Sequence, residues 1–395
     1  MGQYYSYNSV GTAYTYFKDF DYTNSGVKST IASFWNNLYN CIASANNILN
    51  WADKNKGVLG ETNRNQVRGE ALALRAFLHF DLYRLFCPDV KLSPRAEGIP
   101  YNKEFGVALP PMYTVEEVVQ LVINDLKEAE TLLASDPIVS TVPYTLGTKS
   151  DADKYVARMN LYGVKAMLAR VYQAKGDNVK AVAYAKEVIE SGKFRLLEFA
   201  SVDQTEALTD VLFSDEHIFS LRNKELKDYS EKLHRDEKKD GATSFKPLPF
   251  GSYYNWYEGN NDDVRYSKWF NLGDFMKYYM DNTDAFFRKM PMIKLSEMYL
   301  IVAECSFDTD SEMSLEYLNV LRDHRIRNHV HLQYLSKESI QDEMRREYLG
   351  EGQMWYVMKR NNLKIETGAS SGDIEPSDVV YVFPMPDAEI EDGHR

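Results

Sequence analysis

Aromatic residues are concentrated in one segment of this 395-residue chain. From Phe245 to Phe287, 14 of 43 residues are aromatic, against 13% in the whole chain. Such a composition favours sugar binding, because the apolar C–H face of a sugar stacks on an aromatic ring while nearby amides and charged groups bond to its hydroxyls. An equally supported interpretation is that the rings form a local core beneath a region with little secondary structure. The candidate ligand-binding residues are Tyr253, Tyr254, Trp256, Tyr257 and Trp269.

A second, smaller candidate lies near the start of the chain. Tyr22 and Asn24 stand in a segment rich in Tyr, Gly, Ser and Asn, directly before the first expected helix. They offer the same combination of a ring and a side-chain amide, so both are included among the candidate ligand-binding residues. Trp35, inside the helix that follows, has the spacing of a core residue.

Residue types that serve catalysis or metal binding form no recognisable motif. The cluster His324, His329 and His331 lacks the HExxH spacing of a zinc site, and the three cysteines lie far apart without a CxxC pair. The sequence contains no GxSxG, Walker or GxGxxG pattern. We therefore expect no catalytic residue, no metal and no cofactor.

Charged residues are dense at positions 343–351, EMRREYLGE. A retaining glycan-cleaving enzyme would hold two carboxyl groups about 5–5.5 Å apart, and this run supplies three glutamates. The run also fits a helix face on which acidic and basic side chains pair at i, i+4 spacing. We favour the ion-paired helix face.

The segment RGEALALRAFLHFDLYRLF, residues 68–86, indicates how the chain is organised. On a helical wheel it has two apolar stripes separated by narrow charged ridges. A helix that is apolar on two sides packs between neighbours on both of them. We therefore expect an inner helix of a stacked array, whose charged ridges, including an Asp81–Arg84 pair, fasten it to adjacent elements.

Helical periodicity recurs in pairs along the chain. Residues 156–192 have the spacing of a tetratricopeptide helix pair, and Thr114 with Glu117 forms a capping box. The predicted fold is all-α, in which tetratricopeptide-like helix pairs at 29–86, 113–192 and 293–360 form a curved scaffold within a single domain, 1–395. Residues 200–290 lack a continuous period, and we expect a large irregular loop-rich region that carries the ligand site.

The charge of the chain restricts its partners. A formal net charge of −12 and a pI near 5.2 argue against nucleic-acid binding, because neutralising phosphates requires a basic face. No run of about 18 apolar residues predicts a transmembrane helix. The first residues, MGQYYSYNSVGTAYTYF, show no basic and apolar regions of a secretory signal.

Five segments resemble, in order, the SusD/RagB family of glycan-binding lipoproteins of Gram-negative bacteria. They are Trp35-x3-Tyr39-x2-Ile42-x3-Asn46, residues 68–86, Asp263-Val264-Arg265 followed by RKMPMIKLSEMYLIVAEC, the run RREYLGEGQMWYVMKR and the closing YVFPMPDAEI. Each motif is short, but together they extend over most of the chain. The sequence departs from the family pattern at Gln353 and Val357, where the family has Arg and Asp, and it shows neither the signal peptide nor the lipidated cysteine.

The resemblance implies a non-enzymatic protein that binds oligosaccharide or polysaccharide and delivers it to a SusC-like TonB-dependent transporter. It also implies a position on the cell-surface face of the outer membrane, with a lipid anchor in the full-length protein. Two alternatives stay open: a tetratricopeptide-type scaffold that binds peptides or proteins on its concave face, and a glycan-cleaving enzyme.

Overall fold

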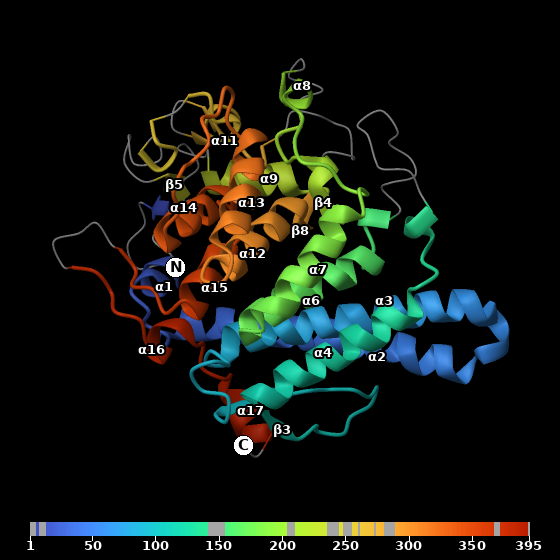
Figure 1. The fold of residues 1–395 in the computed structure, drawn as a ribbon. Helices are drawn as coiled ribbons and strands as arrows, with labels where there is room; N and C mark the ends of the chain where they lie inside the picture. Colours follow the sequence, from blue (N-terminus) through green and yellow to red (C-terminus); the bar gives the residue numbers. More distant parts are fainter. Residues whose placement is uncertain are drawn as a thin grey trace.

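The structure is a computed structural model that shows a stack of helices with a loop-rich region against one side (Figure 1). It describes residues 5–7, 13–140, 155–203, 210–234, 245–247, 255–259, 261–271, 274–279, 289–366 and 372–393. Helices dominate these residues and the strands are short, so the predicted all-α class with tetratricopeptide-like pairs is confirmed. None of the helices in these ranges combines the length and apolar character that a membrane span requires.

The first pair consists of α2 (Ser25–Lys54) and α3 (Lys56–Phe86). Helix α2 begins where the side chain of Asn24 accepts hydrogen bonds from the first free backbone N–H groups of the helix. Helix α3 extends well before residues 68–86, the segment whose periodicity indicated an inner helix, because the chain is helical from Lys56. A kink at Gly60, whose φ is 68°, separates this short start from the long inner helix.

The later pairs follow the expected pattern. Helix α4 (Val115–Leu132) starts with the predicted capping box, and α6 (Leu161–Lys175) turns into α7 (Asn178–Glu190) through Gly176 at a φ of 81°. The array continues with α12 (Leu295–Ser306), α13 (Ser311–Asp323), α14 (Lys337–Glu347) and α15 (Gln353–Arg360). The charged run 343–351 was expected on one helix face, but Gly350 and Gly352 have positive φ and separate α14 from α15. Contacts of α3 with α4, α4 with α6 and α7 with α12 join the pairs into one stack.

Short elements complete the described chain. The helices are α1 (Ala13–Lys18), η1 (Pro137–Ser140), α8 (Phe199–Val202), η2 (Ser214–Glu216), α9 (Leu226–His234), α11 (Val264–Trp269), α16 (Asp378–Tyr381) and α17 (Asp387–Asp392). The antiparallel strand pairs are β1 (Tyr5–Tyr7) with β5 (Phe245–Pro247), β2 (Glu97–Pro100) with β3 (Met112–Thr114), β4 (His217–Arg222) with β8 (Lys289–Lys294), and β6 (Phe270–Asn271) with β7 (Asp274–Phe275). Because β8 runs directly into α12, the β4–β8 pair ties the loop-rich region to the scaffold.

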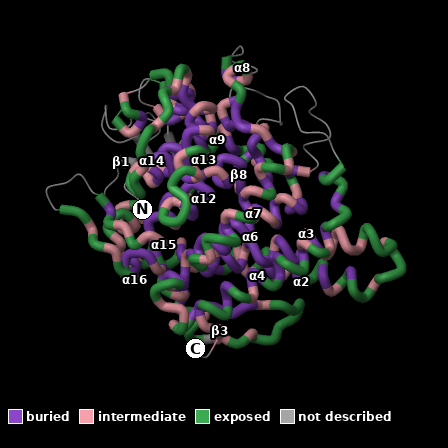
Figure 2. The backbone as a smooth tube through the Cα atoms, viewed as in Figure 1, coloured by how far each residue is buried: buried purple, intermediate pink, exposed green. Residues whose placement is uncertain are grey.

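The charged ridges of α3 fasten it to its neighbours, as predicted. Arg75 forms two hydrogen bonds of 2.7 Å to Asp125 of α4 and one of 2.9 Å to Asn46 of α2. Arg84 pairs with Asp81 on the same helix and donates a 2.9 Å hydrogen bond to Gln353 of α15. Apolar side chains between these ridges belong to a core that runs through the middle of the stack, where Figure 2 shows the buried segments.

His79 on α3 is held neutral inside this core. Its Nδ1 lies 2.9 Å from the carbonyl oxygen of Arg75, and its Nε2 accepts a hydrogen bond of 3.0 Å from the backbone N–H of Asn102. Burial lowers the pKa of His79 to about 3. The unfolded chain, with a pKa near 6.5 at this residue, therefore binds a proton at a pH where the folded protein does not.

We predict that acidification destabilises the protein through His79. Because the folded pKa is depressed, the contribution of His79 to stability is present above about pH 6.5 and is lost as the pH falls, by about 1.4 kcal/mol per pH unit. Denaturant unfolding between about pH 5 and pH 6.5 is expected to show a smaller pH slope for His79→Gln than for the wild type. The slope of the free energy of unfolding against pH reports protonation of His79, whereas the packing change caused by the substitution shifts this free energy at every pH. Equal slopes would contradict the prediction.

A second prediction concerns the close approach of α3 to α4. A Cβ atom at Gly69 would lie 2.6 Å from Cγ of Leu133, whereas one at Gly57 would meet no atom within 4 Å. Gly69→Ala is expected to lower the free energy of unfolding by about 1–3 kcal/mol. The matched Gly57→Ala variant is expected to stay within about 1 kcal/mol of the wild type, on the stabilising side. Thermal or denaturant unfolding measures both, and equal stability of the two variants would refute the packing argument.

Candidate functional site

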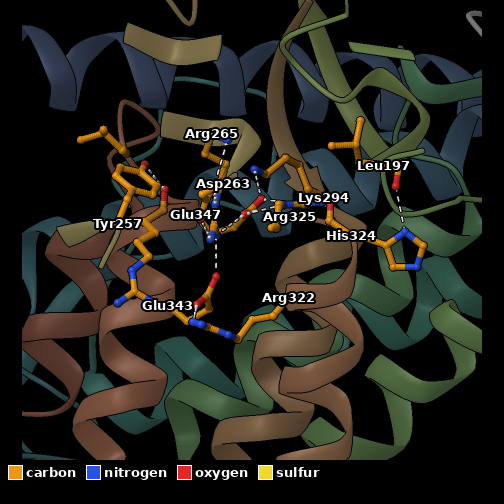
Figure 3. Close-up of polar contacts among 12 residues, drawn as sticks. Leu197, Tyr257, Asp263, Arg265, Lys294, Arg322, His324, Arg325, Glu343 and Glu347 are labelled. Atoms are coloured by element: carbon orange, nitrogen blue, oxygen red, sulfur yellow. Dashed lines mark hydrogen bonds and ion pairs between the residues drawn. The ribbon is translucent and has the colours of Figure 1, made fainter. Parts of the chain in front are cut away.

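The loop-rich region rests on a connected network of buried charges. Among the described residues it joins six cationic to six anionic side chains. Figure 3 shows its centre. Every member except Glu258 has a side chain that is at most 8% exposed. The members of this buried charge network are Arg265, Lys277, Lys294, Arg322, Arg325, Arg346, Glu216, Glu258, Asp263, Glu343, Glu347 and Glu351.

Glu347 of α14 is the centre of the network. Its Oε2 accepts hydrogen bonds from Arg325 Nε at 2.9 Å and from Arg265 Nη1 at 3.1 Å. Its Oε1 accepts hydrogen bonds from Lys294 Nζ at 2.9 Å and from Arg325 Nη2 at 3.0 Å. Burial alone would raise the pKa of Glu347, but these cations outweigh burial and hold the pKa well below its usual range. One carboxylate thereby joins α14 to α11, to β8 and to the turn after α13.

Glu343, one helical turn earlier, is equally enclosed. Its Oε2 lies 2.7 Å from Arg322 Nη1 and 2.8 Å from Arg346 Nη1, and its Oε1 lies 2.6 Å from Arg265 Nη1. Burial acts to raise the pKa of Glu343, and the three guanidinium groups lower it well below the usual value. The expectation of i, i+4 pairs along one helix face is wrong here, because this side of the helix is buried and most of its partners come from other elements.

Lys277 connects the network to the aromatic residues. Its Nζ donates hydrogen bonds of 2.9 Å to the Leu349 carbonyl and 2.7 Å to Glu351, and it lies 3.9 Å from the ring centroid of Trp269. Burial lowers the pKa of Lys277 to about 8. Trp269 is itself fully buried and donates a hydrogen bond of 2.8 Å to the Val211 carbonyl.

Aromatic residues in the described parts of the segment therefore contribute to a local core, in line with one of the two interpretations. This second core is separate from the core of the helical stack. Its buried members are Leu197, Val202, Leu212, Phe213, Leu226, Val264, Trp269, Phe275, Tyr278 and Leu349.

Three of the candidate ligand-binding rings are buried in the protein interior. Trp269 lies inside the second core, and Tyr257 is 1% exposed, with its hydroxyl donating to the Arg346 carbonyl at 3.1 Å. Tyr22 is 8% exposed and its hydroxyl donates to the Val380 carbonyl at 2.6 Å. The structure does not support ligand contact by these rings, because their surroundings are protein.

The other candidates have different positions. The side-chain oxygen of Asn24 caps α2 by accepting from Gly26 and Val27. Tyr253 and Tyr254 lie outside the described residues. Ligand binding by these three residues stays a prediction.

Trp256 is the candidate ring whose surroundings suit a ligand. It is half-buried and packs against the second core, while its neighbour Asn255 is exposed and Glu258 keeps 45% of its side chain exposed. The guanidinium carbon of Arg345 lies 5.6 Å from the Trp256 ring centroid, and the Trp256 carbonyl accepts a hydrogen bond from Arg346. We refer to Asn255, Trp256, Glu258 and Arg345 as the Trp256 surface. Sequence reasoning missed Arg345, because only the fold brings α14 to this segment.

A separate hollow of 310 Å³ opens on the scaffold near the ends of α6, α12 and α15. Its polar groups bind one another: Arg360 and Asn361 both donate to Glu304, and Lys337 pairs with Asp308. Among the residues that the structure describes, Phe307 is the one aromatic residue that lines it. This hollow is less suited to sugar stacking than the Trp256 surface.

We predict that loss of the Glu347 charge destabilises the protein strongly. Glu347→Gln leaves Arg325, Lys294 and Arg265 buried without their common counterion, so the free energy of unfolding is expected to fall by about 3–5 kcal/mol. The control is Asp308→Asn in an exposed pair with Lys337, where we expect a change within about 0.5 kcal/mol. Denaturant unfolding at neutral pH measures both variants. A small effect of Glu347→Gln, comparable to the control, would show that the network does not anchor the fold.

Comparisons with known proteins agree with this architecture. A family profile described as starch-binding and associating with the outer membrane matches residues 2–161, and a SusD family profile matches residues 251–379. A SusD-like protein of Formosa agariphila is 40% identical over 74 residues, which cover 18% of this chain and 14% of that protein.

Solved structures share the fold. A SusD-like carbohydrate binding protein from Bacteroides vulgatus has a TM-score of 0.75 at 20% identity, covering 98% of this chain and 88% of its own. Surface glycan-binding protein A from Bacteroides uniformis has a TM-score of 0.67 at 18% identity, covering 91% of this chain and 83% of its own. At these identities the likeness concerns the fold. Because the two profiles match in order and together extend over most of the chain, the chain belongs to the SusD/RagB family.

Proposed function

We propose that this protein binds oligosaccharide or polysaccharide at the Trp256 surface without cleaving it. The observation that carries the proposal is the position of Trp256, which is half-buried, fixed from behind by the second core and flanked by charged and amide side chains. Family membership and the similarity to proteins known as carbohydrate-binding and glycan-binding support glycan as the ligand.

The geometry suits a shallow sugar site. An indole ring that is anchored on one side loses little conformational entropy when a sugar stacks on it. Asn255, Glu258 and Arg345 supply donors and acceptors for ring hydroxyls at its edge. With one ring and few polar groups, we expect modest affinity. Binding of a neutral glycan would depend little on salt, because no net charge is neutralised.

The buried charge network supports a non-enzymatic role. A glycosidase of the usual kind needs one carboxyl group with a raised pKa to donate a proton and a second carboxylate within reach of the sugar. Glu343 and Glu347 instead have depressed pKa values, and neither side chain is exposed. Both carboxylates are already occupied by buried cations.

We further propose that the protein acts at the cell-surface face of the outer membrane, lipid-anchored in its full-length form. There it would deliver glycan to a SusC-like TonB-dependent transporter. The description of the matching family profile, which includes association with the outer membrane, supports this location. A rigid helical stack with ligand recognition confined to the attached loop-rich region leaves the scaffold available for a partner. Copurification of the full-length protein with a transporter from detergent-solubilised membranes tests this.

The prediction for the site is that Trp256→Ala weakens glycan binding by about tenfold, the equivalent of about 1.4 kcal/mol. Wild type is first screened by affinity electrophoresis against starch and other polysaccharides, and oligosaccharides of the retained glycan are then titrated calorimetrically. The matched control is Trp51→Ala, because Trp51 is 44% exposed on α2 in the scaffold. Unchanged binding by Trp256→Ala, or an equal loss in Trp51→Ala, would refute the site. Binding of peptides and of no glycan would favour the scaffold alternative.

A further inference from the structure

The end of α13 and the loop after it bring one carboxylate and two imidazoles together. Nδ1 of His329 lies 2.8 Å from Asp323 Oδ1, and Nε2 of His331 lies 2.9 Å from Asp323 Oδ2. One ligand atom from each residue lies within 4.8 Å of the other two. The histidine spacing gave no indication of a metal site, because the third group is an aspartate at the end of the preceding helix.

The loop that carries the histidines is fixed in place. The side-chain amide of Asn319 donates to the Leu332 carbonyl at 3.1 Å and accepts from the Leu332 N–H at 2.9 Å. Arg322 Nε donates to Nε2 of His329 at 3.1 Å. The donor atoms thus converge in a preorganised group, and the group opens to solvent because the side chain of His331 is 58% exposed.

The hydrogen bonds determine where the ring protons lie. Because Nε2 of His329 accepts from Arg322, the proton of the neutral ring is on Nδ1 and points at Asp323. The Nε2 of His331 likewise donates to the Asp323 carboxylate. Two ring nitrogens therefore face one carboxylate, where a divalent cation can take the place of both protons.

We propose that Asp323, His329 and His331 bind a divalent transition-metal ion, with Zn²⁺ as the preferred ion. Zn²⁺ binds imidazole nitrogen and carboxylate oxygen at about 2.0–2.2 Å, which separates neighbouring ligands of a tetrahedral site by about 3.3 Å. From the shared oxygen Asp323 Oδ1 the separations are 2.8 Å to His329 Nδ1 and 3.1 Å to His331 Nε2, which need only a small expansion. The two nitrogens, which lie within 4.8 Å of each other, move to the same spacing when the ion binds. Ca²⁺ and Mg²⁺ prefer oxygen ligands alone and are not expected to bind here. Three protein ligands leave a fourth position for water.

Metal binding changes the outer contacts of the site. Each imidazole stays neutral, and its proton moves to the other ring nitrogen, which for His329 is Nε2. Arg322 then releases that nitrogen and keeps its bonds to Glu258 and Glu343. Because the hydrogen bond from Arg322 to His329 is lost, we expect a lower affinity for the metal ion than in a site where the second ring nitrogen donates to an acceptor. Since Glu258 belongs to the Trp256 surface, the metal site borders that surface, but its existence does not depend on glycan binding.

The test is calorimetric titration of ZnCl₂ into EDTA-treated, dialysed protein at neutral pH. We expect one ion per chain in the wild type, and a tetrahedral visible absorption band when CoCl₂ replaces ZnCl₂. His331→Gln and Asp323→Asn are each expected to weaken binding by at least about tenfold. His331 is exposed, so its replacement leaves the fold intact, which circular dichroism verifies. CaCl₂, titrated in the same way, is the negative control and is expected to give no binding at this site.

The matched control is His324→Gln. His324 is adjacent in sequence to Asp323, but its Nδ1 lies 2.8 Å from the Leu197 carbonyl and it is outside the cluster. This variant is expected to keep wild-type Zn²⁺ affinity. The proposal is overturned if the wild type binds no Zn²⁺, or if His331→Gln and Asp323→Asn both bind as the wild type does. The second result would assign the ion to another place, such as the exposed Cys41.

Discussion

Two ionised carboxylates buried on one helix impose the strongest constraint on this structure. Removing a carboxylate from water costs several kcal/mol, and the charge persists only where cations and hydrogen bonds replace the lost hydration. Helix α14 supplies one such cation for Glu343 and none for Glu347. The others come from α11, from the end of β8, and from α13 and the turn after it. Helix α14 can therefore be buried only when all of these elements pack against it. Their packing gives the loop-rich region, which lacks regular periodicity, a defined position on the scaffold.

This constraint also separates the aromatic residues into two roles. Elements held by the network enclose the second core, in which Trp269 is buried. The hydroxyl of Tyr257 donates a hydrogen bond to the backbone carbonyl of Arg346, a member of the network. Trp256 stays at the edge of that core, with its backbone bonded to Arg346 and its ring beside Arg345. The same helix thus contributes the buried charges and a side chain of the proposed binding surface. The buried charge network and the Trp256 surface are adjacent because α14 contributes side chains to both.

Sequence patterns predicted the scaffold well, because its signals are local. The capping box of α4, the Gly176 turn between α6 and α7, and the two-sided burial of α3 are each encoded within a few turns of helix. The site was harder to predict, since a tryptophan in a core and a tryptophan at a surface look alike in sequence. What distinguishes them is contact with distant residues, as between Tyr257 and Arg346, 89 positions apart. The cluster of His324, His329 and His331 was rejected as a metal site on spacing, and the role of Asp323 was missed, because known metal motifs have fixed spacings and this group is assembled by a loop.

The central claim is that the buried charge network holds the loop-rich region against the helical scaffold. Hydrogen–deuterium exchange of the Glu347→Gln variant under native conditions tests it most directly. The largest acceleration of exchange relative to the wild type is predicted for peptides covering residues 255–279 and 324–335, and a smaller acceleration for α2, α3, α4 and α6. Equal acceleration throughout the chain, or none in residues 255–279, would contradict the account.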